Sequence, residues 1–129
     1  MIPSEQYSSQ IRDHLARPRN RGELADANGE GRDENPVCGD VMTIWIRVTG
    51  GRIADARFEV KGCDPSIAAG SEVTEMLKGM NADEVLRLRE DDVNERLGGL
   101  PRSKRHCAAL AVRAVNNAIE DYRRHQDFH

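Results

Sequence analysis

The sequence Asn35-Pro36-Val37-Cys38-Gly39-Asp40 leads directly into an apolar segment that begins at Val41. From Met42 to Val48 apolar residues occupy every second position, and the same alternation returns from Ala54 to Val60. Alternation with a period of two is typical of strands that bury one face. The two segments are joined through Gly50-Gly51, so the sequence predicts a β-hairpin with Cys38 at its open end.

The register of this hairpin follows from which pairing gathers the apolar residues on one face. A two-residue loop at Gly50-Gly51 would set Ile44 against Arg57 and mix the faces. A three-residue loop, Gly50 to Arg52, pairs Ile44 with Phe58 and Val48 with Ala54, and we predict this register. Extended to the open end, it places Gly39 opposite Cys63, so Cys38 and Cys63 should lie close together.

Apolar residues at helical spacing predict helices on both sides of the hairpin. The predicted helices run from a cap at Ser4 to the residue before Pro18, from a cap at Asp64 to about Gly79, from a cap at Asn81 through Leu88, from Asp91 or Asp92 through Leu97, and from a cap at Ser103 to about Arg124. Residues 19–34 read as loop, with one short edge strand near Gly29 to Asp33. The length fits a single domain over residues 1–129, with frayed ends at 1–3 and 125–129.

Composition excludes several classes of protein. The 19 basic and 22 acidic residues give a net charge of −3, too balanced for a nucleic-acid binder. No run approaches the roughly 18 apolar residues of a membrane span, so we expect no membrane association. Three cysteines and a polar N-terminus argue against secretion and disulfides, and favour a reducing cytoplasm.

The three cysteines occupy positions where a thiolate could form. Cys63 directly precedes a predicted helix, and Cys107 lies in the first turn of another, after Arg102, Lys104 and Arg105. Helix N-termini and nearby positive charge lower a thiol pKa. Alternatively, Cys107 is a small hydrophobe in its helix stripe, and Cys38 and Cys63 are ordinary loop thiols. The predicted convergence of Cys38 and Cys63 favours a shared metal over a disulfide.

Two further residues are candidate ligands. His106 is either a fourth ligand or a surface imidazole, and on a regular helix it would point about 100° away from Cys107. Asp40 is either an oxygen ligand or a solvated strand-entry residue. His14, His125 and His129 lack a ligand-like setting and are predicted to be surface residues. A catalytic Cys–His pair is disfavoured, because His106 adjoins Cys107 and no third residue orients it.

A set of motifs in a fixed order carries a more specific signal. The residues concerned are Asn35 to Met42, Gly62-Cys63, Ile67-Ala68, Val73 to Glu75, and Leu100-Pro101 through His106-Cys107, together with an N-terminal pattern at Tyr7, His14, Pro18 to Asn20 and Gly22. In these motifs the chain resembles the NifU/IscU family of iron–sulfur cluster scaffolds, over nearly its whole length.

The resemblance implies an α+β fold, in which a small antiparallel β-sheet of about three strands packs against helices, including a long C-terminal helix. It implies a non-enzymatic scaffold that receives sulfur from a cysteine desulfurase, combines it with iron as a transient [2Fe–2S] cluster, and passes the cluster to apo iron–sulfur proteins. By matching motif, Cys38, Cys63 and Cys107 would be cluster ligands, with His106 or Asp40 at the fourth position. Cys63 or Cys107 would be the first sulfur acceptor, and the same site could take Zn²⁺.

Two segments depart from the family pattern. Leu100-Pro101-Arg102-Ser103-Lys104 stands where the family has Leu-Pro-Pro-Val-Lys, which argues against a dedicated Hsp70-type chaperone partner. Cys63-Asp64-Pro65-Ser66 replaces a run of small residues. The alternatives are a zinc-containing sulfur acceptor of the sulfurtransferase kind and a structural zinc domain, and the latter would unfold without its metal.

Overall fold

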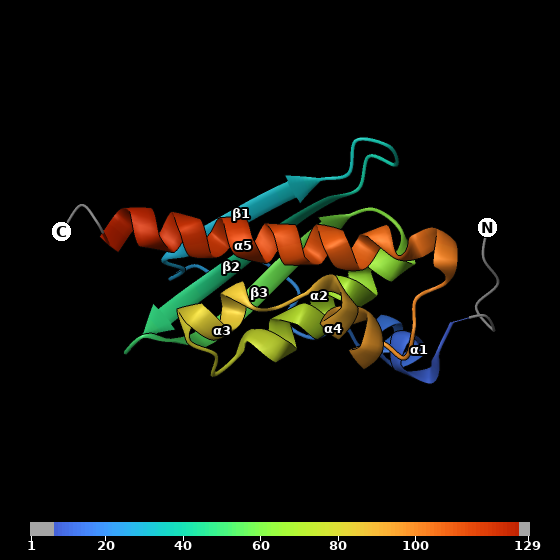
Figure 1. Ribbon diagram of the computed structural model, residues 1–129, viewed down its shortest axis with the longest axis horizontal. Helices are drawn as coiled ribbons and strands as arrows, with labels where there is room; N and C mark the ends of the chain where they lie inside the picture. The colour runs from blue at the N-terminus through green and yellow to red at the C-terminus, as the bar shows by residue number, and fades with distance from the viewer. Residues whose placement is uncertain (1–6, 127–129) are drawn as a thin grey trace.

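The fold was obtained as a computed structural model, and the structure describes residues 7–126 (Figure 1). Its elements, in chain order, are α1 (Ser9–Ala16), β1 (Gly29–Glu34), β2 (Val41–Thr49), β3 (Arg52–Lys61), α2 (Asp64–Leu77), α3 (Ala82–Leu86), α4 (Glu90–Arg96), a 3₁₀ turn (Arg102–Lys104) and α5 (His106–Gln126). The predicted α+β class, with three antiparallel strands and a long C-terminal helix, is confirmed.

The sheet has the order β1-β2-β3, and helices cover one of its faces. Helix α5 lies across β1 and β2, α2 packs against β3, and the two helices contact each other (Figure 1). Met42, Ile44 and Ile46 point from β2 into this layer and are fully buried. The alternation in the sequence therefore marks the face that the helices cover.

Strand β1 confirms the predicted edge strand although its sequence, Gly29 to Glu34, has no apolar alternation. A Cβ atom on Gly31 would lie 2.2 Å from both the carbonyl oxygen of Ala114 and the amide nitrogen of Ala118. The backbones of β1 and α5 thus approach too closely for any side chain at this position. Glycine at position 31 therefore allows the backbone of the strand to lie directly against the backbone of the helix.

The hairpin register is confirmed along most of its length and wrong at its tip. Ile44 pairs with Phe58, as predicted, and Arg47 pairs with Asp55 in the same register, but Val48 pairs with Ile53 instead of Ala54. Gly50 and Gly51 both have positive φ and form a two-residue turn. Such a turn matches the twist of the strands best, and a bulge between Arg47 and Val48 restores the apolar register beyond it.

Three predicted helix caps are corrected. Ser4 lies outside the described residues, and α1 is capped by Ser8, whose hydroxyl accepts a hydrogen bond from the amide of Ile11. Cys63, not Asp64, is the N-cap of α2, while Ser103 belongs to the 3₁₀ turn that precedes α5. The capping box at Asn81 is confirmed.

The ends of the last helices also differ from the prediction. Helix α2 ends at Leu77, two residues before the predicted Gly79. Helix α5 continues to Gln126, beyond the predicted end near Arg124, so residues 125 and 126 are helical, and the predicted fraying of 127–129 lies outside the described residues.

The core fills the space between the sheet and helices α2 and α5. Its largest fully buried side chain is Phe58, and Leu77, Leu110 and Ile119 from the helices pack into the same cluster. Cys107 is part of it. Within residues 7–126, no helix combines the length and the hydropathy needed to cross a membrane.

Candidate metal centre

The loop between β1 and β2 is folded around Asn35. The side-chain oxygen of Asn35 accepts a hydrogen bond from the amide of Val37, and its carbonyl accepts one from the amide of Gly39. The Asn35 amide donates to the carbonyl of Asp40, so the loop closes on itself. Cys38 is exposed at the tip of this loop, while Asp40 is buried where β2 begins.

Cys63 and Cys107 form one pair of potential ligands. Their Sγ atoms lie 3.9 Å apart, because each cysteine stands at the N-terminal end of a helix and the two helices meet there. Cys107 is completely buried, and Cys63 is half-buried. A single metal ion bound by two thiolates would need the two sulfurs at about this separation.

The protonation of this pair is unequal. The hydrogen bond from Cys107 lowers the pKa of Cys63 to about 6, against burial and the Asp40 contact, which raise it. The pKa of Cys107 is raised by its hydrogen bond to Cys63 and by burial. The two shifts have opposite directions, so Cys63 is the more readily ionised of the two thiols. Thiolate is the form that binds metal and attacks sulfur.

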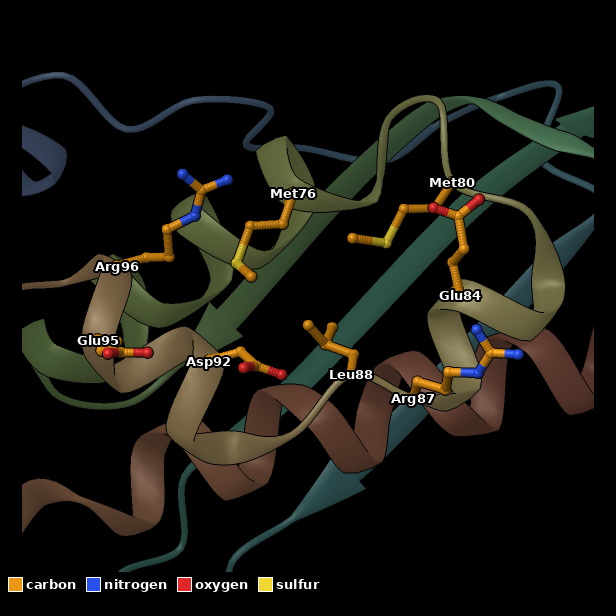
Figure 2. Close-up of a pocket in the computed structure, with 8 residues that line it drawn as sticks. All are labelled: Met76, Met80, Glu84, Arg87, Leu88, Asp92, Glu95 and Arg96. Carbon is orange, nitrogen blue, oxygen red and sulfur yellow. The ribbon is translucent and has the colours of Figure 1, made fainter.

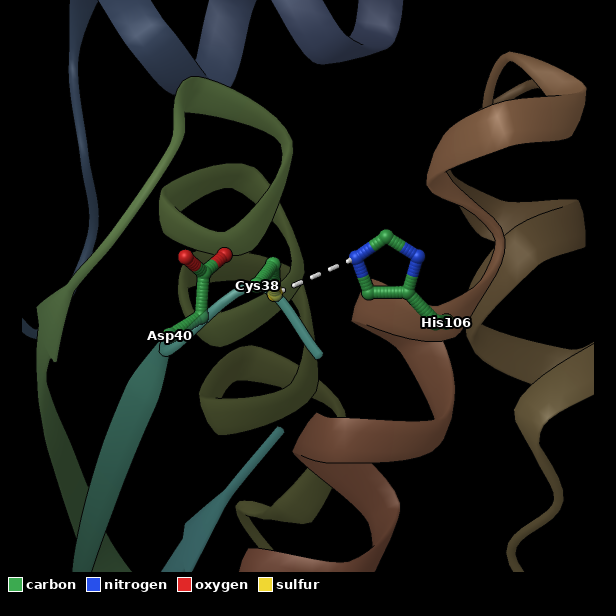
Figure 3. Close-up of side chains that lie close together, drawn as sticks. All are labelled: Cys38, Asp40 and His106. Carbon is green, nitrogen blue, oxygen red and sulfur yellow. Dashed lines mark hydrogen bonds between the residues drawn. The ribbon is translucent and has the colours of Figure 1, made fainter. Parts of the chain in front are cut away.

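Cys38 and His106 form a second pair. The Nε2 atom of His106 lies 3.7 Å from Sγ of Cys38 (Figure 3). His106 is the first residue of α5, so its imidazole turns towards the Cys38 loop while Cys107 faces Cys63. Successive side chains on a helix point about 100° apart, which had argued against His106 and Cys107 binding the same ion. Here that angle directs the two side chains into two neighbouring pairs of potential ligands.

Asp40 lies between the two pairs. Potential ligand atoms of Cys38, Asp40 and His106 lie within 4.8 Å of one another, as do those of Asp40, Cys63 and Cys107. Burial raises the pKa of Asp40, but hydrogen bonds from Ser66 and Cys63 outweigh it and hold that pKa below the ordinary carboxyl value. Asp40 is thus a buried carboxylate that lies between two pairs of softer potential ligands, cysteine sulfurs and an imidazole.

Ser66 is part of this centre, although the sequence analysis did not select it. Its side chain is completely buried in the first turn of α2, and Oγ lies 2.7 Å from Oδ2 of Asp40 and 3.2 Å from Sγ of Cys107. The local signal was its position three residues after Cys63, which places both residues at the same helix end. All five predicted site residues, with Ser66, come together at one end of the molecule.

His14 is not the surface residue that the sequence suggested. It is buried, with Nδ1 2.7 Å from Oγ of Ser71 and Nε2 2.7 Å from Oε2 of Glu72. The backbone amide of Arg19 donates to the same Ser71 hydroxyl. This network fastens α1 to α2. His125 is exposed as predicted, and His129 lies outside the described residues.

A hollow of about 710 Å³ lies elsewhere on the surface, between α2, α3 and α4 (Figure 2). Met76, Met80 and Leu88 face it, and its rim carries both acidic and basic side chains. None of the described residues that line it is a cysteine or histidine. The chemistry of the cysteines is therefore separate from this hollow.

The fold and the ordered cysteine motifs define a class of protein. The sequence model of the NifU-like N terminal domain matches residues 6–128, and the chain belongs to this family.

Relatives include an iron–sulfur cluster assembly scaffold protein IscU of Archaeoglobus fulgidus, 49% identical over 116 residues, which are 90% of this chain and 76% of the relative. The IscU scaffold protein of Escherichia coli K12 is 44% identical over 121 residues, covering 91% of this chain and 94% of the relative.

Solved structures have the same fold. The N-terminal part of a NifU-like protein from Brucella abortus superposes with a TM-score of 0.73 at 19% identity, covering 91% of this chain and 94% of that one. A scaffold protein of the SUF system from Fervidobacterium islandicum gives a TM-score of 0.72 at 21% identity, covering 91% and 99%. At such low identity these structures support the fold alone.

Proposed function

We propose that this protein is a non-enzymatic scaffold on which a [2Fe–2S] cluster is assembled and from which it is transferred to apo iron–sulfur proteins. A cysteine desulfurase would supply the sulfur. The family and the scaffold relatives support the general role. The zinc-containing sulfur-acceptor alternative is not favoured, because the relatives at 44–49% identity are named as scaffolds.

The observation that carries the proposal is the division of the site into two pairs. Cys63 with Cys107, and Cys38 with His106, could each hold one iron, and bridging sulfides would join the two irons. Asp40, within 4.8 Å of ligand atoms in both pairs, could replace a ligand on either iron. A carboxylate is a hard, weak ligand for such a cluster, and this suits a cluster that must leave. The same residues could hold Zn²⁺ in tetrahedral geometry.

Accessibility favours Cys63 as the first sulfur acceptor, with Cys107 as the second. Cys63 is half-buried and its pKa is lowered to about 6, whereas Cys107 is completely buried and its pKa is raised. The Cys63 thiolate would attack the outer sulfur of a persulfide on the desulfurase. A new S–S bond forms at Cys63, the old one breaks, and the desulfurase cysteine leaves as a thiolate.

The sequence gives no support for two other classes of partner. Leu100-Pro101-Arg102-Ser103-Lys104 lacks the family's chaperone motif, and a dedicated Hsp70-type partner is not part of the proposal. The balanced charge likewise gives no support to a nucleic-acid partner.

The proposal is tested by anaerobic reconstitution with ferrous iron, L-cysteine, a cysteine desulfurase and a dithiol reductant, which reduces the persulfide sulfur to sulfide, followed by visible absorption and Mössbauer spectroscopy. We expect equal amounts of iron and sulfide and the quadrupole doublets of a [2Fe–2S] centre. Cys38→Ala, Cys63→Ala and Cys107→Ala should each lose most of the absorption, because each removes a thiolate ligand.

The matched control is a pair of histidine variants. His106→Ala should shorten the lifetime of the cluster, whereas His125→Ala, on the exposed end of α5, should leave it unchanged. A colourless product that holds one zinc ion tightly and no sulfide would overturn the proposal.

A further inference from the structure

The Asp40 carboxylate lies between Gly62 and Ser66. Ser66 ends the segment Cys63-Asp64-Pro65-Ser66, which departs from the family pattern, and Gly62 directly precedes that segment. We propose that Ser66 is the positioning residue of Asp40 and thereby sets the affinity of the site for metal. The proposal rests on the function above only in taking Asp40 as part of the metal site. The contacts on the two sides of the Asp40 carboxylate support this role.

On one side the carboxylate lies against the backbone of Gly62. A Cβ atom at Gly62 would stand 2.5 Å from Cγ of Asp40 and 2.7 and 2.8 Å from its two oxygens. Such distances are far shorter than a contact between non-bonded heavy atoms. The absence of a side chain at Gly62 is therefore what admits the carboxylate to the site.

On the other side the carboxylate receives its hydrogen bonds on a single oxygen. Oδ2 accepts from the Ser66 hydroxyl at 2.7 Å, from Sγ of Cys63 at 3.2 Å and from the Cys63 amide at 3.4 Å. Only the first is short, and Cys63 is itself a candidate ligand, which binds metal as a thiolate and then has no proton to donate. Among the described residues, Ser66 is thus the firm anchor of Oδ2.

The hydroxyl of Ser66 has one proton and three possible acceptors, which are Oδ2 of Asp40 at 2.7 Å, Sγ of Cys107 at 3.2 Å and Sγ of Cys63 at 3.6 Å. The carboxylate oxygen is the closest of the three, and hydrogen bonds to charged oxygen are about twice as strong as neutral ones. Asp40 therefore accepts the hydrogen bond from Ser66. Ser66 is fully buried, so water cannot replace the donor if the hydroxyl is removed.

Hydrogen bonds of this kind fix the orientation of metal ligands, and their loss typically costs about 10- to 100-fold in metal affinity. Without the hydrogen bond from Ser66, the Asp40 side chain would have to be ordered by the metal ion when the ion binds. Ser66 would then act on metal binding through Asp40, without touching the metal.

The test measures the affinity of the metal-free protein for Zn²⁺ by competition with a chromophoric chelator. Ser66→Ala should bind Zn²⁺ about 10-fold or more weakly. The control is Ser71→Ala, which removes an equally buried hydroxyl from the same helix but at the His14 network. Its affinity should stay within about twofold of the unaltered protein, since additive effects are expected of distant sites.

A double-mutant cycle decides how Ser66 acts. In an Asp40→Ala background, Ser66→Ala should change the affinity by less than about twofold, because the group that it positions is gone. Both proteins in that comparison lack the Asp40 carboxylate, so any effect of its removal on the fold is common to the two. The d–d absorption of the Co²⁺-loaded protein should change with Ser66→Ala and not with Ser71→Ala.

The outcomes separate this proposal from the scaffold function. Unchanged Zn²⁺ affinity in Ser66→Ala, or a 10-fold loss that persists without Asp40, would overturn the positioning role. Failure of the unaltered protein to form a [2Fe–2S] cluster would instead overturn the scaffold function, and it would leave the Zn²⁺ result standing.

Discussion

The reactivity of the Cys63 thiol depends directly on its neighbour Cys107. The hydrogen bond from Cys107 lowers its pKa to about 6, so the thiolate fraction rises through pH 6 instead of through the usual range near pH 8.5. In the metal-free protein, alkylation of Cys63 by iodoacetamide should reach half its maximal rate near pH 6. Cys107→Ala should move this midpoint upward, because the donor is lost.

Peptide mass spectrometry can follow each cysteine separately in that titration, so the exposed Cys38 does not obscure the result. Cys107 should stay unmodified across the same pH range, because burial and the pairing with Cys63 raise its pKa. An alkylation midpoint near pH 8.5 in the unaltered protein would contradict the hydrogen bond as the cause of the activation.

The residues of the site and of the His14 network differ in how far the sequence alone predicts their roles. The five predicted site residues could be found because cysteine, histidine and aspartate carry recognisable chemistry at strand and helix ends. Ser66 and His14 could not, since their roles depend on partners far away in the sequence, Asp40 for one and Ser71 with Glu72 for the other. A buried polar side chain is recognised by the group that satisfies it, and local pattern does not show that group.

Among the elements, β1 and α5 pack with their backbones in close contact. At Gly31 the strand lies against the backbone of α5, where a Cβ atom would approach Ala114 and Ala118 to 2.2 Å. Gly31→Ala should therefore push strand and helix apart and lower the free energy of unfolding by about 1–3 kcal/mol or more. Urea denaturation measures this change.

The control for that substitution is the next residue of the same strand. The side chain of Arg32 is exposed, so Arg32→Ala should change the free energy of unfolding by no more than about 0.5 kcal/mol. Equal stability of the two variants would mean that the contact between β1 and α5 is loose.

The elements differ in how much of them the sequence determines. The strands of the hairpin follow from alternation alone, because half of their residues must face the core. The bulge after Arg47 did not follow, since the Gly50-Gly51 turn and the apolar register each demand a different pairing, and one extra residue at Ala54 satisfies both. Strand β1 was only weakly indicated, because α5 stabilises it from outside its own sequence.

For the molecule as a whole, the candidate metal centre lies at the edge of the core. Of its candidate ligands, Cys107 alone is a member of the buried hydrophobic cluster, with Cys63 packed against it. Phe58, Leu77, Leu110 and the rest of the core lie between the sheet and the helices and need no ion. The fold can thus present the ligands before a metal arrives and keep them after it leaves.

Metal removal tests this arrangement. With EDTA in excess, the far-UV circular dichroism at zero urea should be unchanged, because the core supplies the stability of the fold. The urea midpoint should fall, since a ligand present at 100 times its dissociation constant adds about 2.7 kcal/mol. For comparison, Phe58→Ala should remove about 3–5 kcal/mol with or without EDTA, because it empties the centre of the core. If EDTA alone abolished the helical signal, the protein would be a structural zinc domain, in which binding energy is folding energy.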